Sequence, residues 1–129
     1  MNYNDYDFQG IKYAQSGQFD LAIESFKMSI TLNPKGTNGY TNLGLVYTDI
    51  REYSKAISTL KTALEVDPNN VDAYLNLGNA YNNSGQFNLA IESYQKGLEL
   101  NPHDNDIKES LARALNNEAK HNVRQYFKD

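Results

Sequence analysis

The sequence contains no cysteine and no tryptophan among its 129 residues. The missing cysteines exclude disulfide bonds, thiolate metal sites and cysteine nucleophiles, and they agree with a reducing compartment. No apolar run approaches the roughly 18 residues that a membrane-spanning helix needs. Residues 1–10 lack the basic start and apolar core of a signal peptide. We therefore expect a cytoplasmic protein that does not insert into a membrane.

A concentration of positive charge is also missing. The net charge is −4, and each half of the chain, divided after Pro68, carries six basic and eight acidic residues. A nucleic-acid-binding protein needs a basic face, because much of its affinity comes from counterions released by the phosphates. We therefore expect no nucleic-acid partner.

Proline is scarce, and its three copies mark a repeat. Pro34, Pro68 and Pro102 follow one another at intervals of 34 residues, a period typical of helical repeat proteins. Large and small residues recur at the same interval, in the series Tyr6, Gly10, Tyr13, then Tyr40, Gly44, Tyr47, then Tyr74, Gly78, Tyr81, and in Ala22, Ala56 and Ala90. The period divides the chain into repeats 3–36, 37–70 and 71–104 and a final segment 105–127.

Each repeat is predicted to form two amphipathic helices. The expected N-caps are Asn2, Gly36, Asn70 and Asp104 before the first helices and Asp20, Ser54 and Asn88 before the second helices. Gly17 and Gly85 lie in the turns, whereas Arg51 at the equivalent place must either adopt a left-handed backbone or reshape its turn. The predicted helices are 3–16, 19–32, 37–50, 53–66, 71–84, 87–100 and 105–127.

Two stripes on the first helices predict the packing. The stripe centred on Gly10, Gly44 and Gly78 should contact the second helix of the same repeat, because glycine lets two helices approach closely. The other stripe should face the preceding repeat. It is polar in the first repeat, at Asp5, Gln9 and Lys12, and apolar later, at Leu43 and Val46, Leu77 and Ala80, and Ile107, Leu111 and Ala114. The polar copy is expected to stay in water at the N-terminal end of the array.

The series Tyr74, Leu77, Gly78, Tyr81, Ala90, Tyr94 and Pro102 resembles the tetratricopeptide repeat, with tyrosine where that family often has tryptophan. The resemblance covers residues 3–104, and the first repeat departs from it at Gln9 and Ser29. It implies an all-α fold, a right-handed superhelical α-solenoid of three helix-turn-helix repeats plus a long C-terminal solvating helix, in one domain over residues 1–129. It also implies a concave groove, lined by the first helices, that commonly holds an extended peptide or a partner's helix.

The groove should be lined by the face of the first helices that neither stripe uses. The candidate partner-binding residues are Asp7, Phe8, Ile11, Asn42, Leu45, Asp49, Asp72, Leu75, Asn76, Asn79, Asn83 and Arg113. The apolar members either bury a partner's side chains or seal the joints between adjacent first helices. Asn42 and Asn76 lie one repeat apart and are similar to the asparagine ladder of O-linked N-acetylglucosamine transferase, whose amides bind a peptide backbone. The high frequency of asparagine in this chain is the alternative explanation of their placement.

Charge predicts which partner the groove accepts. Some tetratricopeptide co-chaperones hold the acidic C-terminus of heat-shock chaperones with a clamp of lysine, asparagine, asparagine, lysine and arginine. The matching positions here hold Asp7, Ile11, Asn42, Asp72 and Asn76, so only Asn42 agrees and all three cations are missing. We therefore expect a neutral or basic segment of another protein as the partner, because acidic groove residues repel an acidic ligand.

No pattern in the sequence indicates catalysis. His103 and His121 have no nucleophile or metal partner at motif spacing, and Asp104 and Asp106 are typical of a helix N-terminus rather than of a metal site. We expect no catalytic residue, no metal site and no cofactor.

The last predicted helix is longer than a capping helix requires. Val123 and Tyr126 or Phe127 continue its apolar stripe although no repeat remains for them to cover. They are expected to mediate self-association, to bind another protein or to fray in solution. The expected function is thus a non-catalytic protein-protein interaction module or scaffold, and the alternative is structural self-assembly into a homo-oligomer through this helix.

Overall fold

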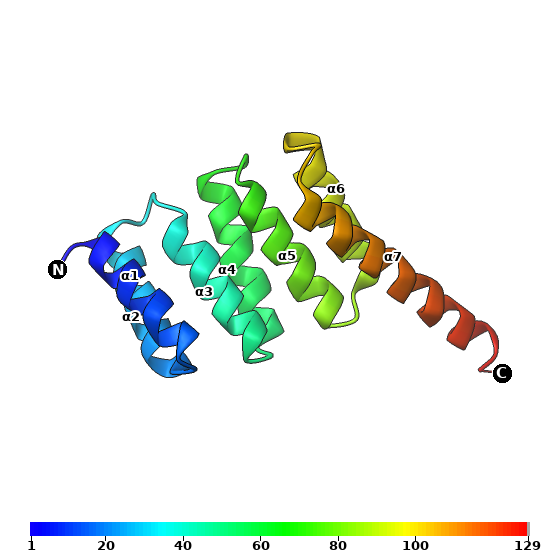
Figure 1. Cartoon of the computed structure of the whole chain (residues 1–129), viewed down its shortest axis with the longest axis horizontal. Helices are drawn as coiled ribbons and strands as arrows, with labels where there is room; N and C mark the ends of the chain where they lie inside the picture. Colours follow the sequence, from blue (N-terminus) through cyan, green and yellow to red (C-terminus); the bar gives the residue numbers. More distant parts are fainter. Residues whose placement is uncertain (129) are drawn as a thin grey trace.

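The computed structural model describes residues 1–128 and consists of seven helices joined by short turns (Figure 1). The helices are α1 (Tyr3–Gln15), α2 (Phe19–Leu32), α3 (Asn38–Asp49), α4 (Tyr53–Val66), α5 (Val71–Asn83), α6 (Phe87–Leu100) and α7 (Asn105–Tyr126). Residues 1–128 contain no strand. The predicted all-α solenoid is therefore confirmed, and each predicted helix boundary lies within one residue of the observed one.

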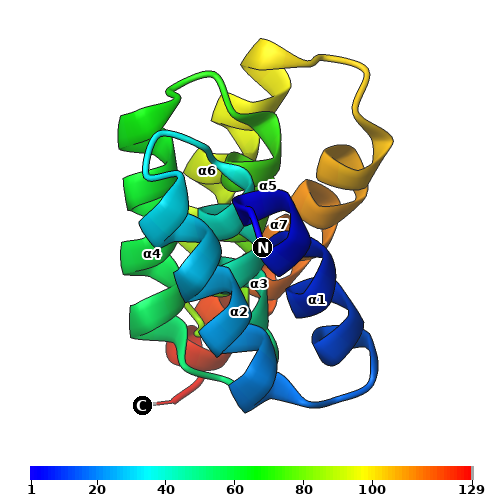
Figure 2. The same ribbon diagram turned by 90° about the vertical axis from the view of Figure 1, so that its left-hand side faces the viewer.

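The helices pair in chain order. α1 contacts α2, α3 contacts α4, α5 contacts α6, and α7 lies against α6 and part of α5. The odd-numbered helices also contact one another in sequence, so that α1, α3, α5 and α7 form a continuous row. Figure 2 looks along the array and shows α4 on the left and α1 and α7 on the right. The row of first helices carries most of the predicted groove residues.

Glycine sets the distance between the two helices of a repeat. A Cβ atom on Gly44 would lie 2.5 Å from Cγ of Leu60, and one on Gly78 would lie 2.6 Å from Cδ1 of Tyr94. Leu60 and Tyr94 are fully buried. The glycine stripe therefore faces the second helix of its own repeat, as predicted, and leaves no space for a side chain.

The second stripe fills the joints between successive repeats. Its buried members are Leu43 and Val46 in α3, Leu77 and Ala80 in α5, and Ile107 and Ala114 in α7. In α1, by contrast, Asp5 and Lys12 are exposed. The predicted change from a polar to an apolar stripe after the first repeat is thus confirmed by the burial of these side chains.

The N-cap of α3 differs from the prediction. Asn2, Asn70 and Asp104 each accept a hydrogen bond from a backbone N–H in the first turn of the helix that follows, as predicted. α3 instead begins after Thr37, whose side chain makes no capping hydrogen bond. The prediction of Gly36 is wrong because this residue closes the preceding turn, where its N–H donates to the Asn33 carbonyl.

The predicted caps of the second helices are also wrong. α2, α4 and α6 begin after Gln18, Glu52 and Gln86, so Asp20, Ser54 and Asn88 lie inside the first helical turn. The cause is the tight turn before each helix. In the first repeat the Gln18 N–H donates to the Tyr13 carbonyl at 2.8 Å, and the Gln18 carbonyl already accepts the first bond of α2.

Arg51 adopts the left-handed backbone with φ of 67°, close to the 76° of Gly17 and the 81° of Gly85. The second repeat therefore keeps the same turn as its neighbours. A left-handed backbone costs a residue with a side chain about 1 to 2 kcal/mol, so this turn is strained where the other two are relaxed.

Candidate partner-binding groove

A cavity of about 330 Å³ opens between α3, α5 and α7 on the row of first helices. We call it the asparagine pocket. It is lined by Leu45, Thr48, Asp49, Asn79, Asn82, Asn83, Tyr94, Ser110, Arg113, Asn116 and Asn117. The structure thus brings together five of the predicted partner-binding residues, namely Leu45, Asp49, Asn79, Asn83 and Arg113. They come from three different helices, so the pocket exists only when three repeat units are stacked.

Tyr94 forms part of the wall of the asparagine pocket. Its side chain is fully buried between α5 and α6, and its hydroxyl donates a hydrogen bond of 2.5 Å to Oδ1 of Asn79. Burial raises the pKa of Tyr94 to about 12, while the charge of Arg113 and a hydrogen bond with Ser110 act to lower it. The hydroxyl is therefore neutral at physiological pH and holds the Asn79 carbonyl, which leaves the Asn79 amide hydrogens for a ligand.

Arg113 and Asp49 supply opposite charges to the pocket. The Arg113 guanidinium lies 3.4 Å from the Ser110 hydroxyl. The one salt bridge found within residues 1–128 joins Lys96 and Glu92, so Asp49 and Arg113 form no direct ion pair. Both charged groups are available to a ligand.

Asp49 lies where its negative charge lowers the stability of the fold. It is the last residue of α3, where a negative charge opposes the helix dipole. Partial burial also raises the pKa of Asp49, since desolvation disfavours the ionised form. A residue that works against local stability is typical of a functional position.

Asparagine amides also link neighbouring first helices. Asn76 donates a long hydrogen bond of 3.5 Å to the Thr41 carbonyl, and Asn117 donates one of 3.2 Å to Oδ1 of Asn82; each pair is 35 residues apart. Asn42 is half-buried, and within residues 1–128 it makes no bond of this kind. The amides of the predicted ladder are therefore unequal, because Asn76 contributes to a joint and Asn42 does not.

The apolar groove residues also differ in exposure. Leu45 is 42% exposed and Ile11 is 40% exposed. Leu75, in contrast, is half-buried and packs against the core cluster that contains Leu77 and Tyr94. Leu75 thus seals a joint between helices, whereas Leu45 opens into the asparagine pocket.

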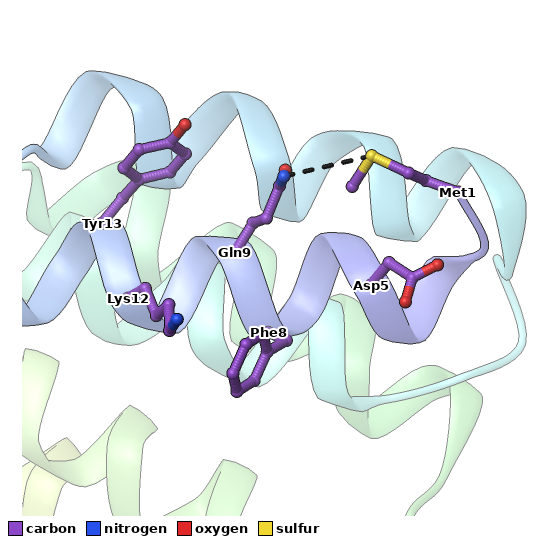
Figure 3. Close-up of a pocket in the computed structure, with 6 residues that line it drawn as sticks. All are labelled: Met1, Asp5, Phe8, Gln9, Lys12 and Tyr13. Atoms are coloured by element: carbon purple, nitrogen blue, oxygen red, sulfur yellow. Dashed lines mark hydrogen bonds between the residues drawn. The ribbon is translucent and has the colours of Figure 1, made fainter.

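Phe8 belongs to a second cavity, at the N-terminal end of the array. This cavity of about 640 Å³ is lined by Met1, Asp5, Phe8, Gln9, Lys12 and Tyr13. Figure 3 shows the Phe8 ring and the Lys12 side chain projecting on the same side of α1. The Lys12 ammonium lies 4.7 Å from the ring centroid of Phe8, a cation–π contact. Phe8 is therefore beside the exposed polar stripe of the first repeat and apart from the asparagine pocket.

Asp7 is withdrawn from the surface. It is only 8% exposed, and its Oδ1 atom has no hydrogen-bond partner in the described part of the chain. Its repeat equivalents Thr41 and Leu75 are buried and half-buried. A buried polar atom without a partner costs about 1 to 3 kcal/mol. Asp72, by comparison, is exposed in the first turn of α5.

The structure adds residues to the predicted groove set. Thr48 and Asn82 lie on the predicted groove face of the first helices, whereas Tyr94, Ser110, Asn116 and Asn117 line the asparagine pocket in addition to the predicted residues. Three of them could have been found by adding the period of 34 residues to groove positions of the third repeat. This step leads from Asn82 and Asn83 to Asn116 and Asn117, and from Asn76 to Ser110.

Two further findings concern the whole described chain. No helix in residues 1–128 is both long enough and apolar enough to span a bilayer. Over the same residues, no three histidine or acidic side chains come together as a metal-binding group.

The distal part of α7 is solvent-exposed. Val123 is 55% exposed, Tyr126 81% and Phe127 77%. Figure 1 shows this end of α7 extending past the other helices towards the C-terminus.

Solved structures share this fold. The first TPR of Spaghetti (RPAP3) bound to HSP90 peptide SRMEEVD is 22% identical, with a TM-score of 0.85 over 92% of this chain and 94% of that one. The first TPR domain of human RPAP3, solved by NMR, is 22% identical, with a TM-score of 0.88 over 92% of this chain and 93% of that one. The Arabidopsis OM64 TPR domain is 21% identical, with a TM-score of 0.80 over 87% and 93%. At such identities the likeness establishes the fold.

Family models identify the repeat itself. The model described as tetratricopeptide repeat matches residues 71–104, and the model described as TPR repeat matches residues 46–85. The sequence matches none of the curated proteins with which it was compared. Residues 46–104 of this chain thus match the tetratricopeptide repeat, and the fold of the chain is that of solved TPR domains.

Proposed function

We propose that this protein is a non-catalytic interaction module, located in the cytoplasm, that binds a neutral or basic extended segment of a partner protein. The observation that carries the proposal is the asparagine pocket, an open polar cavity between three successive first helices. Its amides offer both donors and acceptors, the complement of an extended peptide backbone. Leu45 adds an exposed apolar surface beside them.

Acidic residues favour a basic partner. Asp49, Asp72, Asp106 and Glu109 are exposed on the row of first helices, together with the basic residues Lys12, Lys108 and Arg113. Within the asparagine pocket the charged side chains are Asp49 and Arg113. Such a surface attracts cationic segments and repels anionic ones, and salt weakens both effects.

The peptide in the RPAP3 complex, SRMEEVD, has an acidic C-terminal end. This chain lacks the cations of the co-chaperone clamp, because Asp7 and Asp72 stand at the two lysine positions. We therefore propose that such acidic peptides are not its ligands, and SRMEEVD becomes a useful negative control.

Calorimetric titration of the full protein with peptides of equal length and different charge tests the proposal. Basic peptides should bind with an affinity that falls as salt rises, and SRMEEVD should not bind. Asp49→Asn should weaken the basic peptides, whereas Glu99→Gln, at an exposed acid on α6, serves as the matched control and should have no effect. Equal affinity for acidic and basic peptides would contradict the proposed charge preference.

The asparagine ladder has its own test. Asn42→Ala and Asn76→Ala should each weaken binding by about 0.5 to 1.5 kcal/mol, the net value of a neutral hydrogen bond. The loss should be similar for peptides of different sequence, because the contact is to the backbone. Leu45→Ala should instead penalise some peptide side chains more than others. Binding that is unchanged in both asparagine variants would exclude the ladder.

A further inference from the structure

The last turns of α7 form a free helical segment. Residues 119–128 are all exposed, and the aromatic contact that holds this part of α7 to the array joins His121 to Phe87, with ring centroids 5.9 Å apart. Beyond it, Val123 and Tyr126 of α7 and Phe127 at its C-cap expose apolar side chains with the spacing i, i+3 and i+4. This spacing is the pattern by which a helix presents one apolar face to a groove.

The same segment differs in charge from the rest of the chain. Residues 119–128 contain Lys120, Arg124 and Lys128 and no acidic residue, whereas residues 1–118 contain nine basic and 15 acidic residues. The segment is therefore basic and apolar on a chain that is otherwise acidic. Its charge matches that of the basic partner proposed for the groove, but it presents the side chains of a helix and not an extended backbone.

We propose that residues 119–128 of one copy bind in the groove of a second copy, at the asparagine pocket. The inference rests on the proposed function, since it names a partner for the same site. Lys120 and Arg124 complement Asp49, the acidic side chain of the asparagine pocket, and the apolar face of the segment covers exposed Leu45. Charge complementarity of this kind increases specificity for the partner and raises the association rate.

The segment cannot reach the groove of its own chain. α7 is one continuous helix of 22 residues without glycine or proline. Its first half is anchored by the buried side chains of Ile107 and Ala114. A straight anchored helix cannot fold back, so only a second copy can receive its end. Each copy then offers one groove and one segment, a head-to-tail contact that builds rings or open chains.

Two full-length variants test the contact by complementation. The tail variant carries Lys120→Glu and Arg124→Glu, and the groove variant carries Leu45→Lys and Asp49→Lys. Sedimentation equilibrium of the parent should show self-association that weakens with salt. Each variant alone should associate at least about tenfold more weakly than the parent, because like charges then face each other.

A mixture of the two variants provides the decisive measurement. The groove variant keeps an intact segment and the tail variant keeps an intact groove, and the two altered surfaces carry opposite charges, so the mixture should recover association. Lys27→Glu with Lys61→Glu, at exposed positions on α2 and α4, is the matched control and should associate like the parent. Circular dichroism melts of each variant establish that the fold is retained.

Several outcomes would overturn the inference. A parent protein that stays monomeric at high concentration, or a mixture that fails to associate, excludes a segment in the groove. Association that persists in the groove variant and is lost in the tail variant would mean that two α7 helices pair with each other. Titration of basic peptides into the tail variant separates the two proposals. If the peptides bind while the parent protein stays monomeric, only the inference about residues 119–128 is contradicted. If the peptides do not bind, the proposed function is contradicted as well.

Discussion

Tyr94 serves two purposes at one position of the third repeat. Its repeat equivalents Phe26 and Leu60 fill the same space in the first two repeats, but their side chains carry no polar atom. The Tyr94 hydroxyl reaches the asparagine pocket and bonds Asn79, where the second repeat has Leu45. A residue of the core thus also orients a side chain of the candidate site.

The raised pKa of Tyr94 predicts a loss of stability at alkaline pH. The folded pKa of about 12 exceeds the ordinary tyrosine pKa of 10.0, so the folded protein holds this proton more tightly than the unfolded chain. The contribution is therefore complete below pH 10 and is lost as the pH rises through 12. Urea unfolding at about pH 9 and about pH 11 should show a larger loss for the parent than for Tyr94→Phe. The other nine tyrosines are common to both proteins, so equal losses would contradict the prediction.

Gly78→Ala should destabilise the protein even though alanine is the better helix former. The added Cβ would lie 2.6 Å from Cδ1 of Tyr94, a fully buried ring that cannot move without displacing its neighbours. Overpacking of this kind costs about 1 to 3 kcal/mol. Thermal and urea unfolding measure the difference, and Ser58→Ala, at an exposed position of α4, controls for helix propensity. Unchanged stability of Gly78→Ala would mean that the helix pair is looser than described.

At this scale the sequence predicts directions better than distances. Periodicity correctly places Gly44 and Gly78 against the partner helix, because one close contact dominates there. It also places Asp7 on the groove face, yet Asp7 is buried. The reason is that periodicity gives the direction of a side chain and not the approach of the neighbouring helix. The bond from Tyr94 to Asn79 escapes prediction for the same reason, since it depends on how far a side chain reaches across two helices.

Helix starts show a similar limit at the scale of the element. Asp20 is a favoured N-cap type, but α2 begins one residue before it, at Phe19. The turn decides, because Gly17 adopts a left-handed backbone and the Gln18 N–H bonds the Tyr13 carbonyl. The helix lengths follow from the hydrophobic pattern and the prolines, whereas the capping residue depends on turn geometry.

The two halves of α7 should respond differently to mutation. Ile107 is fully buried and fills the space over Gly97, where an added Cβ would lie 2.8 Å from its Cδ1 atom. Ile107→Ala should therefore cost about 2 to 5 kcal/mol. Deletion of residues 122–129 removes, over the described positions 122–128, only exposed side chains. At a protein concentration where the parent is monomeric, the melting temperature should therefore not change. Calorimetric melting compares both variants with the parent, and a large loss on truncation would show that the distal segment belongs to the fold.

At the scale of the whole molecule, the 34-residue period accounts for most of the fold. It predicts seven helices and the packing of their stripes, because each unit of such an array contacts only its neighbours. The asparagine pocket needs three successive units and their relative rotation, which no single repeat encodes. Even so, Asn116 and Asn117 are the repeat equivalents of Asn82 and Asn83, 34 residues further along the chain. The composition of the pocket is thus open to prediction from sequence, and its volume is not.

Stability should be graded along the array. The first repeat has a neighbour on one side only and exposes Asp5 and Lys12 on the other. α4, α5 and α6 have contacts on both sides. In a linear array, stability is a sum of repeat terms and nearest-neighbour interfaces, so the ends open at a lower free energy than the middle. Native-state hydrogen exchange should therefore be fastest in α1, α2 and residues 119–128, and slowest in α4 to α6.

Leu43→Ala makes this prediction specific to one joint. Leu43 is buried in the stripe that faces the first repeat, and it shares a core cluster with Ala22 and Phe26 of α2. Shortening it weakens the interface between the first two repeats by about 2 to 5 kcal/mol. Exchange in α1 and α2 should therefore accelerate far more than exchange in α5 and α6, whereas Ile107→Ala should accelerate exchange in α7 first. If both variants accelerate all amides equally, the chain opens as one cooperative unit, and the nearest-neighbour description does not apply to an array of this length.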